Sequence, residues 1–417
     1  MNKTIEKLKI LIVCEHSSDT FGGEAVLPLH YFKRLNARSE DAWLITHVRT
    51  KASLEKSIPD LINRIYFIPD TWLHVTLHKL GKLLPHRIAL ISTSAISHMI
   101  TQGYQFFLAR KAIKEHDIDV VHEPAPVSPK QPSILFGLGV PVIIGPMNGG
   151  VNFPNSFSFM QGKVEKYLYI VVRALSNLLN VVIPGKFFAK VLLVANERTR
   201  RALPRFTKGK IIEFVENGVD LSLWKPAMIN KKLEKSQFTL IFLGRLIDLK
   251  CVDLLIKAFS QLNEEYDAKL LIVGEGKERN SLEILSRELG IEQKVEFLGW
   301  VSQQDCPKLL YKSDVLVLPS VRECGGAVVL EAMAAELPVI AVNWGGPADY
   351  ITPETGILIE PEQKDVFIDK LSEAMQLLFN DKDKRLLMGK AGRLRVEEEF
   401  DWDKKIDNIM KIYRDVL

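Results

Sequence analysis

Glu323 and Glu331 stand eight positions apart, and each could accept hydrogen bonds from the hydroxyl groups of one ligand. The apolar run Val315 to Leu318 predicts a strand before them, and good helix formers follow the glycines Gly325 and Gly326. Backbone N–H groups at the start of such a helix can bind an anion. The segment therefore predicts a site for a ligand with hydroxyl and anionic groups. The alternative is an ordinary carboxylate stabilised by the helix dipole.

A second candidate site follows the apolar run Thr239 to Leu243. A strand there would end at Gly244 and leave Arg245 and Lys250 at the carboxyl edge of a sheet, where two fixed cations could neutralise a diphosphate. Alone, an arginine and a lysine at this spacing usually face solvent. Beside the first segment, we interpret them as ligands.

A third segment holds the paired glycines Gly22 and Gly23, after the predicted strand Lys9 to Cys14. Glycines let a backbone approach a phosphate closely because no side chain obstructs it. The segment is not the G-x-G-x-x-G dinucleotide fingerprint, so by itself it is weak evidence.

Short apolar runs alternate with longer amphipathic ones throughout the chain, which predicts two doubly wound α/β domains with parallel sheets. Strands this apolar should be buried on both faces. We expect one domain over residues 1–212 and a second over 213–399, with a linker near 217–237 and a C-terminal helix at about 400–417 that packs back on the first. The further expected strands are Asp41 to Thr46, Asp119 to His122, Val140 to Ile144, Val191 to Ala195, Lys269 to Val273, Val295 to Phe297 and Val339 to Val342.

These segments together resemble glycosyltransferase family 4. Pro319 to Met333 is similar to the family's E-x7-E motif, and Gly244 to Lys250 is similar to its G-R-L-x-x-x-K-G segment, although Cys251 replaces the last glycine. Glu216 to Asp220 and Val295 to Val301 extend the likeness over most of the second half. The resemblance implies a GT-B fold, two Rossmann-like domains with an interdomain cleft. It also implies hexose transfer from a UDP- or GDP-sugar with retention of anomeric configuration.

The resemblance also implies roles for individual residues. Arg245, Lys250 and Glu323 would be catalytic, the cations acting on the leaving diphosphate and Glu323 on the donor sugar. Glu331 would bind the ribose, and the main chain after the segment that ends at Gly299 would read the base. The expected donor-binding positions are Gly22, Gly23, Trp300, Val301, Gly325, Gly326, Ala327, Val328 and Glu331.

The acceptor side is less specified. His16 ends the first predicted strand and should face the cleft. Some relatives place a histidine where this chain has Met147 or Asn148, so that role does not transfer, and Asn148 either holds a sugar hydroxyl or caps its loop. His74 and His78 have helical i,i+4 spacing, but the sequence offers neither a third ligand nor a Glu beside the first histidine. We therefore expect neither a metal nor another cofactor.

Charge divides unevenly along the chain. Residues 1–220 hold 28 Lys and Arg against 18 Asp and Glu, whereas the remainder holds 27 against 33. The basic half would favour an anionic surface or a lipid-linked acceptor. The segment 153–206 combines apolar residues with Lys163, Lys166, Arg173, Lys186 and Lys190, and either lies on a membrane or forms core helices with basic outer faces.

The remaining features place the chain inside the cell. The first residues lack the apolar core of a secretory signal, no stretch has the length of a membrane span, and the four scattered cysteines should be reduced. We expect a cytoplasmic protein, with the inner face of the membrane as a hypothesis, a saccharide or lipid-linked acceptor as partner and no nucleic acid.

Two other functions remain open at this stage. A sugar-nucleotide epimerase of the same fold would act without an acceptor. A catalytically silent subunit would bind the nucleotide and regulate a partner. The donor base, the sugar, the acceptor and the oligomeric state do not follow from the sequence.

Overall fold

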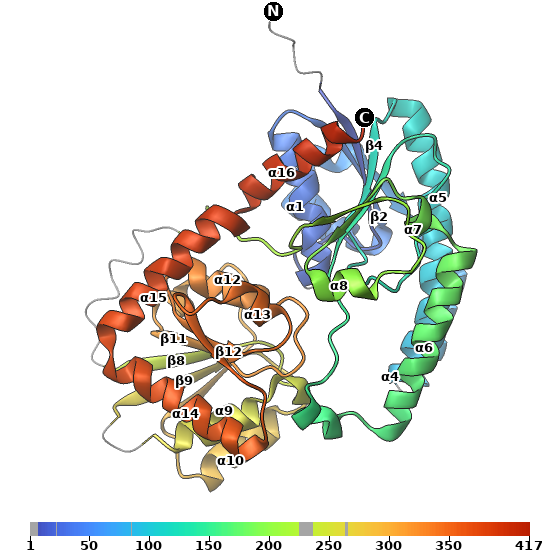
Figure 1. The fold of residues 1–417 in the computed structure, drawn as a ribbon. Coiled ribbons are helices and arrows are strands. Elements are labelled where there is room, and N and C mark those ends of the chain that lie inside the picture. The colour runs from blue at the N-terminus through green and yellow to red at the C-terminus, as the bar shows by residue number, and fades with distance from the viewer. Residues whose placement is uncertain (1–6, 22, 85, 225–236, 263–265) are drawn as a thin grey trace, which may run out of the picture. The chain divides into compact units, whose positions relative to one another are not determined.

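The chain forms two compact units, each built on one parallel β-sheet (Figure 1). The computed structural model describes residues 7–21, 23–84, 86–224, 237–262 and 266–417. Unit 1 contains residues 1–150, 163–216 and 406–417, and unit 2 contains residues 151–162 and 217–405. Two Rossmann-like domains, as the sequence predicts, are therefore confirmed.

The sheet of unit 1 has seven strands in the order β3-β2-β1-β4-β5-β6-β7, and the strand pairs are parallel. Helices α1 and α5 lie on opposite sides of it (Figure 1), so the central strands are covered on both faces. The strands are β1 (Lys9–Val13), β2 (Asp41–His47), β3 (Ile65–Ile68), β4 (Val120–Glu123), β5 (Val142–Met147), β6 (Val191–Val194) and β7 (Lys210–Glu213).

The sheet of unit 2 has six strands in the order β10-β9-β8-β11-β12-β13. Counted from its first strand, this is the 3-2-1-4-5-6 order of doubly wound folds, in which ligands bind at the carboxyl ends of the strands near the order reversal. That point lies between β8 and β11. The strands are β8 (Phe238–Leu243), β9 (Ala268–Val273), β10 (Val295–Gly299), β11 (Val315–Leu318), β12 (Val339–Val342) and β13 (Gly356–Ile359).

Helices supply the outer layers of both units. In unit 2, α12 and α13 lie on one side of the sheet, and α9 and α14 on the other (Figure 1). The helices are α1 (Gly23–Ala37), α2 (Lys51–Ser57), α3 (Trp72–Lys82), α4 (His86–Ala89), α5 (Ala95–His116), α6 (Lys163–Val182), α7 (Gly185–Phe188), α8 (Glu197–Ala202), α9 (Val252–Ser260), α10 (Arg279–Glu288), α11 (Cys306–Tyr311), α12 (Ala327–Ala334), α13 (Gly346–Tyr350), α14 (Lys364–Asn380), α15 (Lys382–Arg395) and α16 (Trp402–Asp415).

The ten strands expected from apolar runs are confirmed, with ends that shift by up to three residues. Every residue of β4, β6, β11 and β12 is buried, as two-sided burial requires. Strands β3, β7 and β13 were not among the expectations. Each is four residues long and lies at an edge of its sheet. The ends of β7 are charged and exposed, whereas β3 and β13 are apolar but short and only partly buried.

The unit boundaries differ from the expected ones in the segment 151–162, which belongs to unit 2. There Phe157 packs edge-on against Phe367, with 5.7 Å between the ring centroids, and the indole N–H of Trp344 donates to the carbonyl of Asn152 at 2.8 Å. Most of the expected linker, residues 225–236, lies outside the described residues.

Residues 406–417, most of α16, belong to unit 1. The hydroxyl of Tyr413 lies 2.6 Å from Nδ1 of His122, and Nε2 of His122 lies 2.6 Å from the carbonyl oxygen of Gly145. That carbonyl can only accept, so Nε2 carries the ring proton and Nδ1 accepts from the tyrosine. Burial lowers the pKa of His122 to about 4, against the smaller opposing effect of the Gly145 hydrogen bond, so the ring is neutral at pH 7.

We expect Tyr413→Phe to lower the free energy of unfolding by about 1 to 3 kcal/mol, because it leaves a buried imidazole acceptor without its donor. Urea unfolding followed by circular dichroism measures this change. Tyr104→Phe, at an exposed position of α5, is the matched control and should change little. Equal stability of the two variants would show that the Tyr413 hydroxyl contributes nothing.

Candidate functional site

In unit 2, the predicted cations follow β8 at the carboxyl edge of the sheet. Arg245 is exposed, and Lys250 ends a short 3-10 turn, Asp248–Lys250. The backbone N–H of Val321, just after β11, donates to the carbonyl of Leu249 at 3.2 Å. This hydrogen bond joins the loop after β8 to the loop after β11, at the point where the strand order reverses.

Lys250 and Glu323 form an ion pair between these two loops. Both side chains are mostly buried, with 15% and 17% of their surface exposed. The sequence predicted both residues, and the structure brings them into contact. A pair this sheltered holds its two charges in fixed positions, and removal of one partner leaves the other charge uncompensated.

The glycine positions after Glu323 are required by close backbone contacts. Gly345 has φ +72°, and a Cβ there would lie 2.1 Å from the carbonyl oxygen of Glu323. The N–H of Gly346 donates to the same oxygen at 2.9 Å. Gly326, with φ +83°, precedes the first residue of α12. The backbone therefore turns sharply into α12, whose first N–H groups have no partner within the helix.

The other predicted donor positions also lie at this edge. Glu331 is in the second turn of α12, and burial raises the pKa of its carboxyl to about 7. Gly299, the last residue of β10, accepts from the N–H of Gly274 at 2.8 Å, which places the next residue, Trp300, beside the end of β9. Trp300 is 75% exposed and Val301 is half-buried, so both are open to a ligand.

Two departures from the family motif occur in the same loops. Cys251, at the position of the family's glycine, has φ +48°, in the left-handed region that glycine adopts easily and other residues rarely adopt. The cysteine therefore has the backbone conformation that would favour a glycine at this position. Cys324 is exposed between Glu323 and Gly325, whereas the other cysteines are buried. All four are free thiols, as expected.

In unit 1, Gly22 lies outside the described residues, and Gly23 begins α1. A Cβ at Gly23 would meet nothing within 4 Å among the described residues, so the backbone there is open to close approach. The amide of Asn148 is buried and donates to Glu216 Oε1 at 2.7 Å, and its oxygen lies 3.5 Å from Oγ1 of Thr199. These contacts favour the second role considered for Asn148, in which its side chain caps the loop instead of holding a sugar hydroxyl.

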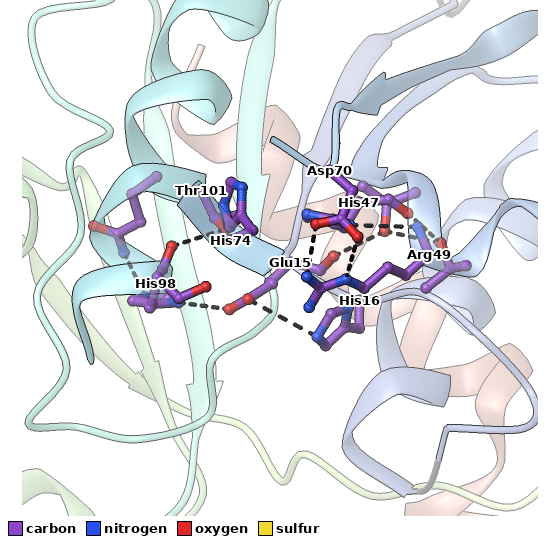
Figure 2. A network of polar contacts seen from close by, with 12 residues as sticks. Glu15, His16, His47, Arg49, Asp70, His74, His98 and Thr101 are labelled. Atoms are coloured by element: carbon purple, nitrogen blue, oxygen red, sulfur yellow. Dashed lines mark hydrogen bonds and ion pairs between the residues drawn. The ribbon is translucent and has the colours of Figure 1, made fainter. Parts of the chain in front are cut away.

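His16 lies at the edge of a pocket of about 550 Å³ in unit 1. Glu15, the neighbour of His16, and Arg49, after β2, line the pocket with it. The remaining walls come from α3 and from the segment that leads into α5. Figure 2 shows that Glu15, Arg49, Asp70 and four histidines form a network of polar contacts beside this pocket.

The sequence reasoning missed most of this network. Glu15, Arg49, Asp70 and His98 were not expected to act together, and His16 was the one member of this network named for the acceptor side. A usable signal was present, because Glu15, Arg49 and Asp70 each lie two positions beyond the end of a strand, and parallel strands bring those ends to one edge.

Three side chains of the network, His47, Asp70 and His74, place their ligand-type atoms within 4.8 Å of one another. However, Nδ1 of His47 accepts the N–H of Arg49 at 3.3 Å, and Nδ1 of His74 accepts the N–H of Thr71 at 3.3 Å. In the neutral rings Nε2 then carries the proton and is not a ligand. Arg49 also occupies both oxygens of Asp70, at 2.7 and 3.0 Å. The hydrogen bonds favour a structural cluster over a metal centre.

Comparison with known proteins identifies the second half of the chain. Residues 225–395 match the family model described as glycosyl transferases group 1. A GDP-mannose-dependent monoacylated alpha-(1-6)-phosphatidylinositol monomannoside mannosyltransferase from Corynebacterium glutamicum is 34% identical over 231 residues, which cover 51% of this chain and 59% of that protein. The N-acetyl-alpha-D-glucosaminyl L-malate synthase of Bacillus anthracis is 28% identical over 99% of this chain and 98% of its own length.

Solved structures share the fold over the whole chain. HepE from Anabaena, determined in complex with UDP, matches with a TM-score of 0.67 at 19% identity, over 98% of this chain and 100% of its own. A glycosyltransferase from Rickettsia africae matches with a TM-score of 0.65 at 18% identity, over 98% of each chain. The chain spans 54% to 59% of the length of the first two curated relatives. Residues 225–395 are thus similar to the group 1 glycosyl transferases, and the whole chain shares its fold with solved glycosyltransferases.

Proposed function

We propose that the protein is a retaining glycosyltransferase, which moves a hexose from a nucleotide-diphosphate sugar to a saccharide or lipid-linked acceptor. Such a reaction belongs to polysaccharide, glycolipid or cell-envelope biosynthesis. The observation that carries the proposal is the sheltered Lys250–Glu323 pair beside the glycine turn into α12. The names of similar proteins support a nucleotide-sugar donor, because one depends on GDP-mannose and another was solved with UDP.

In this proposal the donor lies across the carboxyl edge of the unit 2 sheet. Lys250 and Arg245 neutralise the charge that develops on the leaving diphosphate. The amides of Gly325, Gly326, Ala327 and Val328 bind sugar and phosphate oxygens. Glu323 accepts a hydrogen bond from the donor sugar, and Glu331 accepts from the ribose.

The remaining donor contacts come from main chain. The base lies against Trp300 and Val301, and the diphosphate approaches the amide of Gly23, where no side chain intervenes. Because the fixed cations supply the neutralising charge, the reaction needs no metal ion and no other cofactor. The acceptor hydroxyl attacks on the face that the diphosphate leaves, so the anomeric configuration is retained. Its proton passes to the departing phosphate.

His16 and the adjacent 550 Å³ pocket are assigned to the acceptor. Burial lowers the pKa of His16, and the charges of Arg49 and His98 act in the same direction while Glu15 opposes them. The imidazole is therefore neutral at pH 7 and can exchange hydrogen bonds with hydroxyl groups. Asn148 stabilises its loop and does not bind the acceptor, because its amide is hydrogen-bonded to Glu216 and Thr199.

The acceptor proposal includes contact with a membrane. At the end of α6, Leu178, Val181 and Val182 are 60% to 70% exposed, beside an apolar pocket of about 880 Å³. Three basic residues lie close together there, because burial and then the positive charges of Arg173 and Arg205 lower the pKa of Lys130, which requires both arginines to be near it. Exposed apolar side chains among cations suit an anionic phospholipid surface. Lys186, expected on that surface, is instead buried and donates to the carbonyl of Ser128 at 2.9 Å. In the described chain, no helix has the length and apolarity to cross a membrane.

A panel of uridine, guanosine and adenosine sugar nucleotides, scored by thermal shift, tests the donor proposal, since a bound ligand stabilises the folded state by mass action. Turnover of the best donor with and without acceptor extracts then separates the transferase from an epimerase, which needs no acceptor. A pure protein that binds a sugar nucleotide but turns over none would favour the silent subunit.

We expect Lys250→Ala to lower kcat by about 100-fold or more, because the charge on the leaving diphosphate loses its fixed partner. Steady-state kinetics with the best donor measure this. Lys312→Ala, at an exposed position of the same unit, is the matched control and should retain activity. Normal kcat in Lys250→Ala would remove this residue from the site.

We expect the affinity for UDP-glucose or GDP-mannose, whichever binds, to rise about tenfold from pH 6 to pH 8. With a pKa of about 7, the Glu331 carboxyl is ionised to roughly one tenth at pH 6 and nine tenths at pH 8, and the ionised form accepts the ribose hydrogen bonds. Glu331→Gln should bind about 1 to 3 kcal/mol more weakly at pH 8, without this pH dependence. Titration calorimetry at several pH values measures both effects, with Glu292→Gln, an exposed position, as control. The same slope in Glu331→Gln would contradict the assignment.

We expect the protein to sediment with phosphatidylglycerol vesicles at low salt, and not with phosphatidylcholine vesicles. Val182→Asp should weaken this binding, because it places a negative charge among exposed apolar side chains. Leu387→Asp, equally exposed on α15, is the control. Absence of sedimentation with anionic vesicles at low salt would end the membrane proposal.

A further inference from the structure

Hydrogen bonds to its main chain hold Glu15 at the carboxyl edge of the unit 1 sheet, and its side chain lines the pocket. Its carbonyl oxygen accepts from the N–H of His47 at 2.9 Å and from Oγ1 of Thr46 at 3.2 Å, which fixes the backbone two residues beyond β1. Its side chain lines the 550 Å³ pocket and is 27% exposed. The carboxylate thus lies beyond the end of the strand, between His98 and His16 (Figure 2), and both Glu15 and His16 line the pocket.

A directional chain of hydrogen bonds orients this carboxylate. The amide nitrogen of Gln102 lies 2.8 Å from the carbonyl oxygen of Pro132, which can only accept, so the orientation of the amide is settled. The same nitrogen lies 3.0 Å from Nε2 of His98 and donates to it. The proton of the neutral His98 ring is then on Nδ1, which donates to Oε2 of Glu15 at 2.6 Å.

Among the residues that the structure describes, the second carboxylate oxygen of Glu15 has no hydrogen-bond partner. Oε1 of Glu15 lies 3.8 Å from Nε2 of His16, too far for a hydrogen bond. Burial acts to raise the pKa of Glu15, but the hydrogen bond from His98 and the nearby imidazoles outweigh it, and the pKa is lowered. The group is therefore a charged acceptor with one oxygen in use and one facing the pocket.

The charges around the pocket nearly cancel. Glu15 and Lys82, with opposite charges, both line it, and the charge of Arg49 is matched by that of Asp70, to which it makes two hydrogen bonds. Those bonds use two of the five donors that a guanidinium has, which leaves donors for a ligand. Hydroxyl groups of Ser94 and Ser97 add further polar contacts, and Leu77 contributes an apolar wall. Such a lining suits a neutral ring with many hydroxyls better than an anion, which would meet the Glu15 carboxylate.

We propose that Glu15 is a specificity-determining residue, whose Oε1 accepts a hydrogen bond from a hydroxyl of a neutral sugar or cyclitol ring bound in this pocket. His98 and Gln102 are positioning residues that act through Glu15. If the ligand is the acceptor, the inference rests on the proposed function and narrows it to an acceptor whose bound part is an uncharged polyol. An acceptor such as L-malate, named in one relative, carries carboxylates that Glu15 disfavours.

The test measures binding of neutral rings and of an anion to the full chain. Glucose, mannose, galactose, N-acetylglucosamine, myo-inositol and L-malate are titrated one at a time and followed by ligand-observed NMR. We expect at least one neutral ring to bind and L-malate not to bind. L-malate binding more tightly than every ring, or no ring binding at all, would overturn the proposal.

Variants then place the contact. Glu15→Gln should weaken binding of the best ring by at least tenfold, whereas Glu55→Gln, an exposed glutamate of α2, should not change it. His98→Leu should weaken it too, and His98→Asn, which can still donate to Glu15, should restore most of the affinity; a role of His98 in folding alone would not distinguish these two. Unchanged ring binding in Glu15→Gln overturns the proposal. Sugar-nucleotide binding, measured separately, reports on unit 2, so failure of this inference is distinct from failure of the proposed function.

Discussion

The candidate donor site depends on how closely the loop after β12 approaches the loop after β11. The carbonyl oxygen of Glu323 binds the N–H of Gly346 and lies where a side chain at Gly345 would have to be. Backbone is therefore packed on backbone, and the Glu323 side chain is left to turn toward Lys250. A loop restrained in this way can hold a charged pair in one geometry before any ligand arrives, which is what fixed electrostatic stabilisation requires.

Much of unit 2 could be predicted from sequence because its strands are apolar on both faces and end at turn residues. Strands β11 and β12 were predicted with both ends correct. Lys250 and Glu323 were predicted individually, because each follows such a strand within a recognisable motif. Their contact was not predicted, because it depends on β8 and β11 being neighbours in the sheet. In the sequence, 71 residues lie between Leu243, the end of β8, and Val315, the start of β11, so only the strand order brings the two loops together.

Unit 1 shows where this reasoning stops. The network around Glu15 joins the ends of β1 and β2 to α5, and the hydrogen bond from His98 to Glu15 links residues 83 positions apart. Histidine and glutamate are ordinary on a helix such as α5, so His98 carries no signal until the helix is packed on the sheet. The edge strands β3, β7 and β13 were also missed, because each is only four residues long and partly buried, too short for its pattern to predict a strand by itself.

The composition of unit 1 from three separate stretches has a consequence for synthesis of the chain. Its first strand leaves the ribosome before any strand of unit 2, yet Tyr413, the hydrogen-bond donor to His122 in its core, follows all of them. During translation the unit 2 sheet, whose strands are contiguous from β8 to β13, is completed while unit 1 still lacks residues 406–417. The half that is made first is thus the half that is finished last.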